Sequence, residues 1–339
     1  MDTAASRLKL SSTDVRRWLG QSPITGPLLT LVIIFGLFSL FIPNFLSLQT
    51  LSNIINATTL VGTVTVGVTF LMISGEFDLS VGALVAVAGY LFAFNTMNGG
   101  SPLLALALAV VVPALLGTVN GLILVATGMP SFIITLGTLS IFRGGVWLLS
   151  GGSLLQTLER PLIYDIFNGR LDVINNLLPD GANFRTAMLW MFGLVILFQY
   201  LLTRTSYGNH VLAVGGNPGA ARAQGVNVQL IKVLNFTLSG AMAGVAGVLL
   251  FSQFRSVRVA TGAGVELDAI AAAVVGGTLL TGGSGSIVGG LIGVLLISTL
   301  RSGVIRLNIP FIPADNFEAV VGVTIVGAAI LNHWLRNRA

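Results

Sequence analysis

The sequence predicts an all-α polytopic membrane protein with about ten transmembrane helices. Of its 339 residues, 54% are hydrophobic and only 9% are charged, whereas soluble domains carry about 25% charged residues. The mean hydropathy is +0.92, and the apolar residues gather in runs of roughly 17–25, the length at which a helix spans a bilayer. An ordinary soluble globule is therefore excluded, and the 42 glycines suit close helix packing within a membrane.

Ten apolar runs are candidate spans, and eight is the alternative because several runs are short or interrupted by glycine. The ten runs are 27–43, 52–73, 79–95, 103–126, 131–149, 187–202, 231–251, 266–280, 286–305 and 317–334. No small-residue cleavage motif follows the first run, so we interpret it as an uncleaved span. An even number of spans places both termini on one side of the membrane.

The basic residues favour the cytoplasmic side for both termini. The N-terminal tail contains four of them, and such charges usually weigh most in orientation. The bias over the whole chain is weak, since nine of the 17 basic residues fall on the side of the termini. The predicted parts are a cytoplasmic tail at 1–26, a membrane domain at 27–335 with an outer loop at 150–186 and an inner loop at 203–230, and a cytoplasmic tail at 336–339.

Two segments resemble each other and predict an inverted internal repeat. GEFDLSVGALVAVAG at 75–89 is matched by VELDAIAAAVVGG at 265–277 at an offset of 190, with an acidic pair in each. The two helix starts are five spans apart, so they would face opposite sides of the membrane, and a substrate path would lie near the repeat interface. Asp78 and Asp268 are interpreted as helix caps, with a substrate or gating role as the alternative.

One face of the second run carries hydroxyl and small residues. Thr58, Gly62, Thr65 and Thr69 follow one another at helical spacing, which is typical of helix packing with hydroxyl hydrogen bonds. The alternative is a polar wall along a path for a hydroxylated solute. The residues that would line this path are Thr58, Thr65, Thr69, Asp78, Asn95, Asn120, Phe132 and Asn235.

Several functional classes are excluded by missing residue types. The chain has no Cys and only two His, so we expect no metal site. Its only lysines, Lys9 and Lys232, do not follow a glycine-rich loop, which excludes a P-loop for ATP. No nucleophile, base and acid set is visible, so we expect no catalysis and no cofactor. The basic residues are dispersed, which argues against nucleic acid as a partner.

The inner loop at 203–230 is a long polar segment between two spans. Tyr207-Gly208 and Gly215-Gly216-Asn217-Pro218 are turn signals. Proline at a first helical position, followed by an alanine-rich stretch, predicts a short helix over 218–223 that stops at Gly225. A loop of this length is uncommon unless it is functional, so we expect a helix outside the membrane that another protein grips.

Four blocks together resemble one family over nearly the whole chain from residue 27. They are GEFDLSVGALVAVAG at 75–89, Asn120-Gly121, PSFIITLGTLSIFRG at 130–144 and YGNHVLAVGGNPGAARAQGVNV at 207–228. The chain resembles the permease subunits of bacterial ABC importers for monosaccharides such as ribose, xylose, arabinose and galactose, which are distantly similar to branched-chain amino-acid permeases. The family often has Gly-Gly-Ile-Asp in the first block, where this chain has Gly75-Glu76-Phe77-Asp78, a departure that bears on subfamily or substrate.

The resemblance implies a multi-pass subunit of the bacterial inner membrane that works with several partners. These are a second permease subunit, in a homodimer or a heterodimer, a cytoplasmic ABC ATPase, a periplasmic sugar-binding protein and membrane lipid. The family's cytoplasmic coupling helix maps onto 208–227, and the binding protein would dock on 150–186 and 252–264. The expected ATPase-coupling residues are Tyr207, Gly208, Gly215, Gly216, Asn217, Pro218, Ala221, Arg222 and Gly225.

Two other functions are alternatives to an ABC permease. A secondary transporter or facilitator would usually bury ionisable residues deep in its spans, and they are scarce here. A membrane-embedded enzyme would need clustered catalytic side chains. The sequence leaves the transported sugar or polyol open, because the resemblance places most of the specificity in the binding protein.

Overall fold

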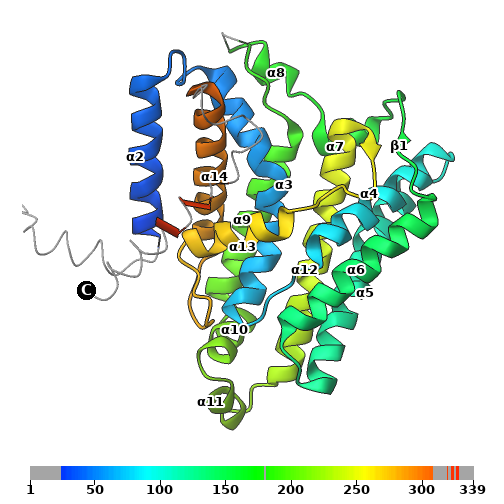
Figure 1. The fold of residues 1–339 in the computed structure, drawn as a ribbon, viewed down its shortest axis with the longest axis vertical. Coiled ribbons are helices and arrows are strands. Elements are labelled where there is room, and N and C mark those ends of the chain that lie inside the picture. The colour runs from blue at the N-terminus through cyan, green and yellow to red at the C-terminus, as the bar shows by residue number, and fades with distance from the viewer. Residues whose placement is uncertain (1–23, 179–180, 308–318, 320–321, 324–325, 328–339) are drawn as a thin grey trace, which may run out of the picture.

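The computed structural model describes residues 24–178, 181–307, 319, 322–323 and 326–327. The predicted tails, and most of the predicted span at 317–334, lie outside these residues. Figure 1 shows a bundle of helices with two short helices, α10 and α11, at one end and α8 at the other. The all-helical prediction is confirmed, since within the described residues the only strands are β1, Leu155–Gln156, and β2, Ser256–Val257, paired antiparallel.

Six described helices are long and apolar enough to cross a membrane: α3 Leu48–Ile73, α5 Pro102–Thr127, α6 Ser131–Ser150, α9 Thr186–Arg204, α12 Val228–Phe254 and α14 Ile287–Leu307. Two shorter apolar helices, α2 Thr25–Phe41 and α4 Val81–Met97, accompany them. The run at 266–280 forms only the eleven-residue α13, Val265–Val275. Ten spans therefore remain a prediction.

Helix α12 occupies the centre of the bundle and packs on α5 through small residues. A Cβ at Gly117 or Gly121 of α5 would collide with the backbone of α12, and one at Gly240 or Gly244 of α12 would collide with the backbone of α5. Interhelical contact at backbone distance is typical of membrane bundles, in which small residues replace the hydrophobic effect as the driving force. This packing fixes the position of the side chains that α5 and α12 share.

The inner loop forms two helices rather than one. Helix α10 covers Ser206–Gly216 and α11 covers Pro218–Ala223. The predicted helix at 218–223 is confirmed, with Asn217 accepting a hydrogen bond from Ala220 N at 3.0 Å as its cap. The predicted turn at Tyr207-Gly208 is wrong, because both residues lie within α10, whose valines are buried against α3 and α12.

The predicted repeat places its acidic pairs differently in the two segments. Glu76 and Asp78 precede α4, whereas Glu266 and Asp268 lie in the first turn of α13. The two helix starts nevertheless meet, since a Cβ at Gly82 would collide with the Glu266 carboxylate. The segments are thus neighbours in space, and their relation by an inverted repeat stays a prediction.

A side chain of α9 caps the start of α14. Gln199 Oε1 accepts hydrogen bonds from Ile287 N at 3.0 Å, Val288 N at 3.2 Å and Ser286 Oγ at 3.2 Å. We expect Gln199→Leu to lower the free energy of unfolding by about 1–3 kcal/mol, because buried amide groups lose their acceptor. Thermal unfolding in detergent measures this loss. Gln199→Glu retains an acceptor and should be milder, and equal losses would contradict the capping role.

Two more short helices lie in the outer loop. They are α7 at Leu162–Asn168 and α8 at Asp172–Asn175, and the long helix α9 begins after them at Thr186. Asn168 Nδ2 donates to Leu249 O at 2.9 Å, which ties α7 to the far end of α12. The loop is therefore an ordered cover over one end of the bundle, opposite to the end that carries α11 (Figure 1).

Candidate functional site

The candidate site is centred on the break between α3 and α4, residues 74–80, which we call the break. Gly75 has φ +88°, a left-handed conformation that favours glycine, and it lets the chain leave α3. Glu76 N donates to Leu71 O at 3.2 Å, and Phe77 N donates to Ser131 Oγ at 3.0 Å at the start of α6. The break is thus held by hydrogen bonds to two helices.

Asp78 is the centre of a buried polar cluster. Its side chain is fully buried, and its Oδ1 accepts from Ser80 N at 2.9 Å and from Ser80 Oγ at 2.6 Å. Its Oδ2 accepts from Ser239 Oγ of α12 at 3.1 Å, and Asn120 of α5 donates to Ser80 Oγ at 2.9 Å. Three hydrogen bonds to the carboxylate offset its removal from water. We call Asp78, Ser80, Asn120 and Ser239 the Asp78 cluster.

A second polar contact joins the break to the start of α12. Lys232 Nζ forms an ion pair with Glu76 Oε1. The side chains are only 11% exposed for Glu76 and 22% exposed for Lys232. The contact therefore lies largely out of solvent, and it connects the break with the helix that follows α11.

Glycines bring three backbones together beside the break. Gly283 N donates to Ile73 O at 2.8 Å. A Cβ at Gly215 would collide with Ile73 O and would lie 2.5 Å from Gly283 N, and a Cβ at Gly282 would lie 2.9 Å from Gly75 Cα. We call Gly75, Gly215, Gly282 and Gly283 the glycine junction. Through it α10 touches both the end of α3 and the loop that leads from α13 to α14.

Tyr207 fastens α10 to the bundle from the side. Its hydroxyl donates to Asn235 Oδ1 of α12 at 2.5 Å, and its ring stacks on Phe70 of α3 with centroids 6.1 Å apart. Burial raises the pKa of Tyr207 to about 12, so the hydroxyl keeps its proton and remains a donor at physiological pH. Tyr207 therefore anchors α10 rather than presenting its ring to a partner.

The expected coupling residues divide into an inner and an outer set. Gly208 and Ala221 are buried, and Tyr207 and Gly215 face the bundle. The exposed set is Gly216, Asn217, Pro218, Arg222 and Gly225. The sequence has no Asp or Glu from 181 to 265, so every formal charge that the inner loop exposes is positive.

The expected path residues do not gather around one cavity. Thr58 and Thr65 are at most 1% exposed and donate to carbonyls of their own helix at 2.8 and 2.7 Å. Among the rest, Asp78 and Asn120 belong to the Asp78 cluster, Asn235 bonds to Tyr207 instead, and Phe132 is 53% exposed on α6. Thr69 is fully buried, and Asn95 is half-buried. Their role in translocation stays a prediction.

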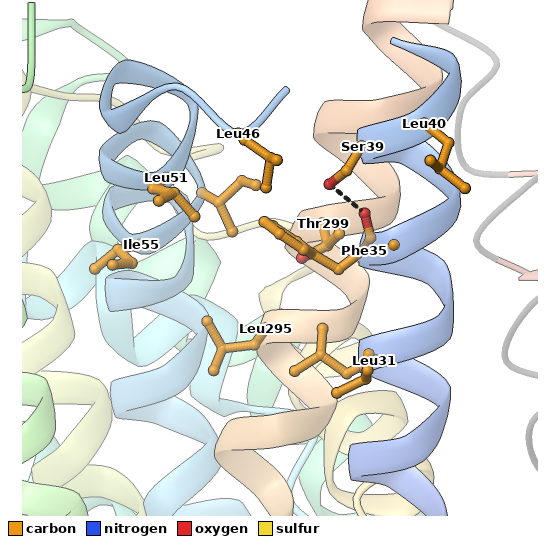
Figure 2. A pocket seen from close by; sticks show the side chains of 12 residues that line it. Leu31, Phe35, Ser39, Leu40, Leu46, Leu51, Ile55, Leu295 and Thr299 are labelled. Carbon is orange, nitrogen blue, oxygen red and sulfur yellow. Dashed lines mark hydrogen bonds between the residues drawn. The ribbon is translucent and has the colours of Figure 1, made fainter. Parts of the chain in front are cut away.

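Two pockets among the described residues differ in polarity. One is an apolar groove of about 730 Å³ between α2, α3 and α14, lined by residues such as Leu31, Phe35 and Leu295 (Figure 2). The other, about 440 Å³, lies where α12 ends and α13 begins, and includes Ser256, Arg258 and Thr261. Only the second offers the hydrogen-bonding groups that a hydroxylated solute needs. The described residues contain no group of three His, Asp or Glu that could hold a metal ion.

Sequence reasoning missed the partners of the break. The sequence does not predict Ser80, Ser239 or Lys232 as contacts of the break, nor the close approach of Gly282 and Gly283 to it. One signal was present, since Lys232 is the only lysine beyond the N-terminal tail. A lone lysine near a span in an apolar chain points to an acidic partner.

Comparison with known proteins gives the family. The family described as branched-chain amino acid transport system / permease component matches residues 50–329. The ribose import permease protein RbsC of Bacillus subtilis (strain 168) is 36% identical over 91% of this chain and 92% of its own length. RbsC of Escherichia coli (strain K12) is 33% identical over 90% and 91%. The L-arabinose ABC transporter permease protein AraH of Azospirillum brasilense is 33% identical over 84% and 81%.

No solved structure matches the chain. The family match covers most of the chain, including the break, both short helices of the inner loop and the glycine junction. The relatives match nearly end to end, so the likeness extends over the whole membrane domain rather than over one motif. The chain belongs to the family of branched-chain amino acid transport system permease components.

Proposed function

We propose that this chain is the membrane-spanning permease subunit of an ABC importer for a monosaccharide or a similar polyol. The names of its relatives, a ribose import permease and an L-arabinose ABC transporter permease, support the substrate class. The observation that carries the proposal is the inner loop, in which two short helices leave the bundle at one end and stay attached to the break. In this proposal a separate cytoplasmic ATPase hydrolyses ATP, and the chain itself is not an enzyme.

The remaining parts of the assembly follow from this proposal. Two permease subunits, identical or different, lie in the bacterial inner membrane with their termini in the cytoplasm, and each has about ten spans. The ATPase grips α11, and a periplasmic sugar-binding protein docks at the opposite end, on 150–186 and 252–264. The polar pocket at the start of α13 adjoins that end, so it is the place where a released sugar first meets the chain.

The structure suggests how force on α11 reaches the bundle. Helix α11 follows directly on the end of α10, where Gly215 belongs to the glycine junction and backbones touch with no side chain between them. Such a contact transmits a displacement with little loss, because close-packed groups resist compression. Movement of α11 would displace the end of α3 and the loop before α14 together. The Asp78 cluster would then pass this displacement to α4, α5 and α12, whose arrangement sets the path.

The positive charge that the inner loop exposes indicates the charge of the partner surface that would bind it. Arg222 of α11 is exposed, and no acidic residue lies on the loop, so we expect the ATPase groove to be acidic. Arg222→Glu should weaken binding of the ATPase subunit about tenfold at low salt, and added salt should narrow the difference because it screens exposed charges. Titration of the labelled ATPase subunit into the purified permease measures both effects.

The matched control is Arg170→Glu at the opposite end of the bundle, where Arg170 pairs only with the exposed Asp172. This variant should bind the ATPase as the unchanged chain does. Equal binding by Arg222→Glu and the unchanged chain would refute an acidic groove. Sugar uptake that depends on ATP and on the loaded binding protein, in vesicles that hold the whole complex, tests the function itself.

A secondary transporter is the second candidate, and the buried carboxylate of Asp78 favours it. Carriers driven by protons or ions place such groups in their spans. Vesicles with the permease alone separate the two functions. Sugar flux driven by a pH or sodium gradient without the ATPase would support the secondary transporter and refute the ABC importer.

A further inference from the structure

The ion pair between Glu76 and Lys232 stands apart from the other three that the described residues form. The pairs Arg160–Asp165 and Arg170–Asp172 lie in the outer loop with side chains 41–69% exposed. The Arg301–Asp268 pair is longer, at 3.6 Å, and joins α14 to α13. Only Glu76 and Lys232 combine strong burial with a link between the break and the inner loop's end.

Burial makes this pair a poor device for stability alone. Moving two charges out of water offsets most of their attraction, and apolar residues of similar size often serve stability as well. Such a pair can instead fix the relative position of the two segments that carry it, because each buried charge has a single favourable partner.

The pair closes a second connection between the inner loop and the break. The first connection is the glycine junction, which holds Gly215 just before α11. Lys232 lies just after α11, five positions beyond the Asn227 cap that begins α12. Helix α11 is therefore fastened to the break on both sides, by backbone contact before it and by an ion pair after it.

We propose that Glu76 and Lys232 are a positioning pair that makes the start of α12 move with the break when α11 is displaced. The proposal rests on the proposed function, in which an ATPase displaces α11. Without the pair, α11 would pivot on the glycine junction and the start of α12 would lag behind. ATP would still be hydrolysed, but a smaller part of the displacement of α11 would be transmitted to the Asp78 cluster in each cycle.

Three variants test the pair: Glu76→Gln, Lys232→Gln, and the exchanged double variant Glu76→Lys with Lys232→Glu. The first readout is amide hydrogen exchange at the start of α12 in the purified permease, which needs no partner. We expect exchange there to be about tenfold faster in the single variants, a factor that corresponds to about 1.4 kcal/mol, and to be largely restored in the exchanged variant.

The second readout is the amount of sugar transported per ATP hydrolysed by the reconstituted complex. We expect it to fall several-fold in the single variants and to recover in the exchanged variant, with ATPase binding unchanged. Arg306→Gln, which removes an exposed charge in the last turn of α14, is the control and should alter neither readout.

Results other than these contradict either the ion pair, its positioning role or the proposed function. Unchanged exchange in the single variants, or an exchanged variant no better than they are, overturns the ion pair as a fastening. Faster exchange with unchanged sugar per ATP shows that the pair only stabilises α12 and overturns its positioning role. If the unchanged complex shows no ATP-dependent uptake, the proposed function fails, while the exchange readout still decides whether the pair holds α12.

Discussion

Replacement of Asp78 by leucine lowers the free energy of unfolding by about 3–5 kcal/mol, because three hydrogen-bond donors lose their acceptor in the protein interior. The donors are Ser80 N, Ser80 Oγ and Ser239 Oγ. A loss of this size is a large share of the 5–15 kcal/mol that stabilises a typical protein, so little folded permease should be recovered. The midpoint of thermal unfolding in detergent, followed by tryptophan fluorescence, measures the effect on what folds.

Asp78→Asn separates the hydrogen bonds from the charge. The asparagine oxygen can replace Oδ1 as acceptor for Ser80, and the hydroxyl of Ser239 can rotate to accept from the amide. We therefore expect a loss of about 1 kcal/mol, well below that of leucine. Asp172→Leu removes an exposed carboxylate and should be nearly neutral. If Asp78→Leu were no worse than Asp78→Asn, the Asp78 cluster would not hold the break.

The second large effect is expected at the glycine junction. Gly283 has φ +77°, and a Cβ there would lie 2.6 Å from Gly216 Cα, so alanine adds both backbone strain and a collision with backbone. Strain of this kind costs about 1–2 kcal/mol, and overpacking costs about 1–3 kcal/mol. We expect Gly283→Ala to separate α10 from the loop before α14 and to reduce sugar uptake per ATP at least tenfold, while the ATPase still binds.

Gly128 supplies the control for this experiment. It has φ +66° at the end of α5, but a Cβ there meets no atom within 4 Å. Gly128→Ala therefore carries similar strain without the collision and should lose stability but not coupling. Comparable loss of uptake per ATP in both variants would show that strain alone, and not contact between backbones, explains Gly283→Ala.

Local signals in the sequence predicted the elements that depend on neighbouring residues. Helix α11 is predicted because a proline, an alanine-rich stretch and a terminal glycine follow one another along the sequence. At Tyr207-Gly208 the sequence predicts a turn, because glycine is typical of turns. These residues are helical because α10 packs against the bundle, and this packing is not visible in the local sequence. Helix α13 was expected to be longer, because apolar composition does not show where Gly276 and Gly277 end a helix.

The site depends on pairs that are distant along the chain. Asp78 meets Ser239 across 161 positions, and Glu76 meets Lys232 across 156. The periodicity of apolar residues predicts local secondary structure, but it does not predict which distant side chains meet. Asp78 as a cap was foreseen, and its Oδ1 does accept from Ser80 N, but its bond to α12 follows only from the packing of α3 and α5 on that helix.

The shortness of α13 bears on how this part of the chain sits in a bilayer. Eleven residues make a helix about 16 Å long, about half the roughly 30 Å of hydrocarbon in a bilayer, and α13 lies across the bundle rather than along it (Figure 1). Non-helical backbone at such a depth is tolerated only beside protein or water. Here Gly283 N bonds to Ile73 O on one side, and Gly262 O lies against α4 on the other. Helix α13 alone is therefore too short to span a bilayer, and the segments before and after it depend on α3 and α4, rather than on lipid, for their backbone contacts.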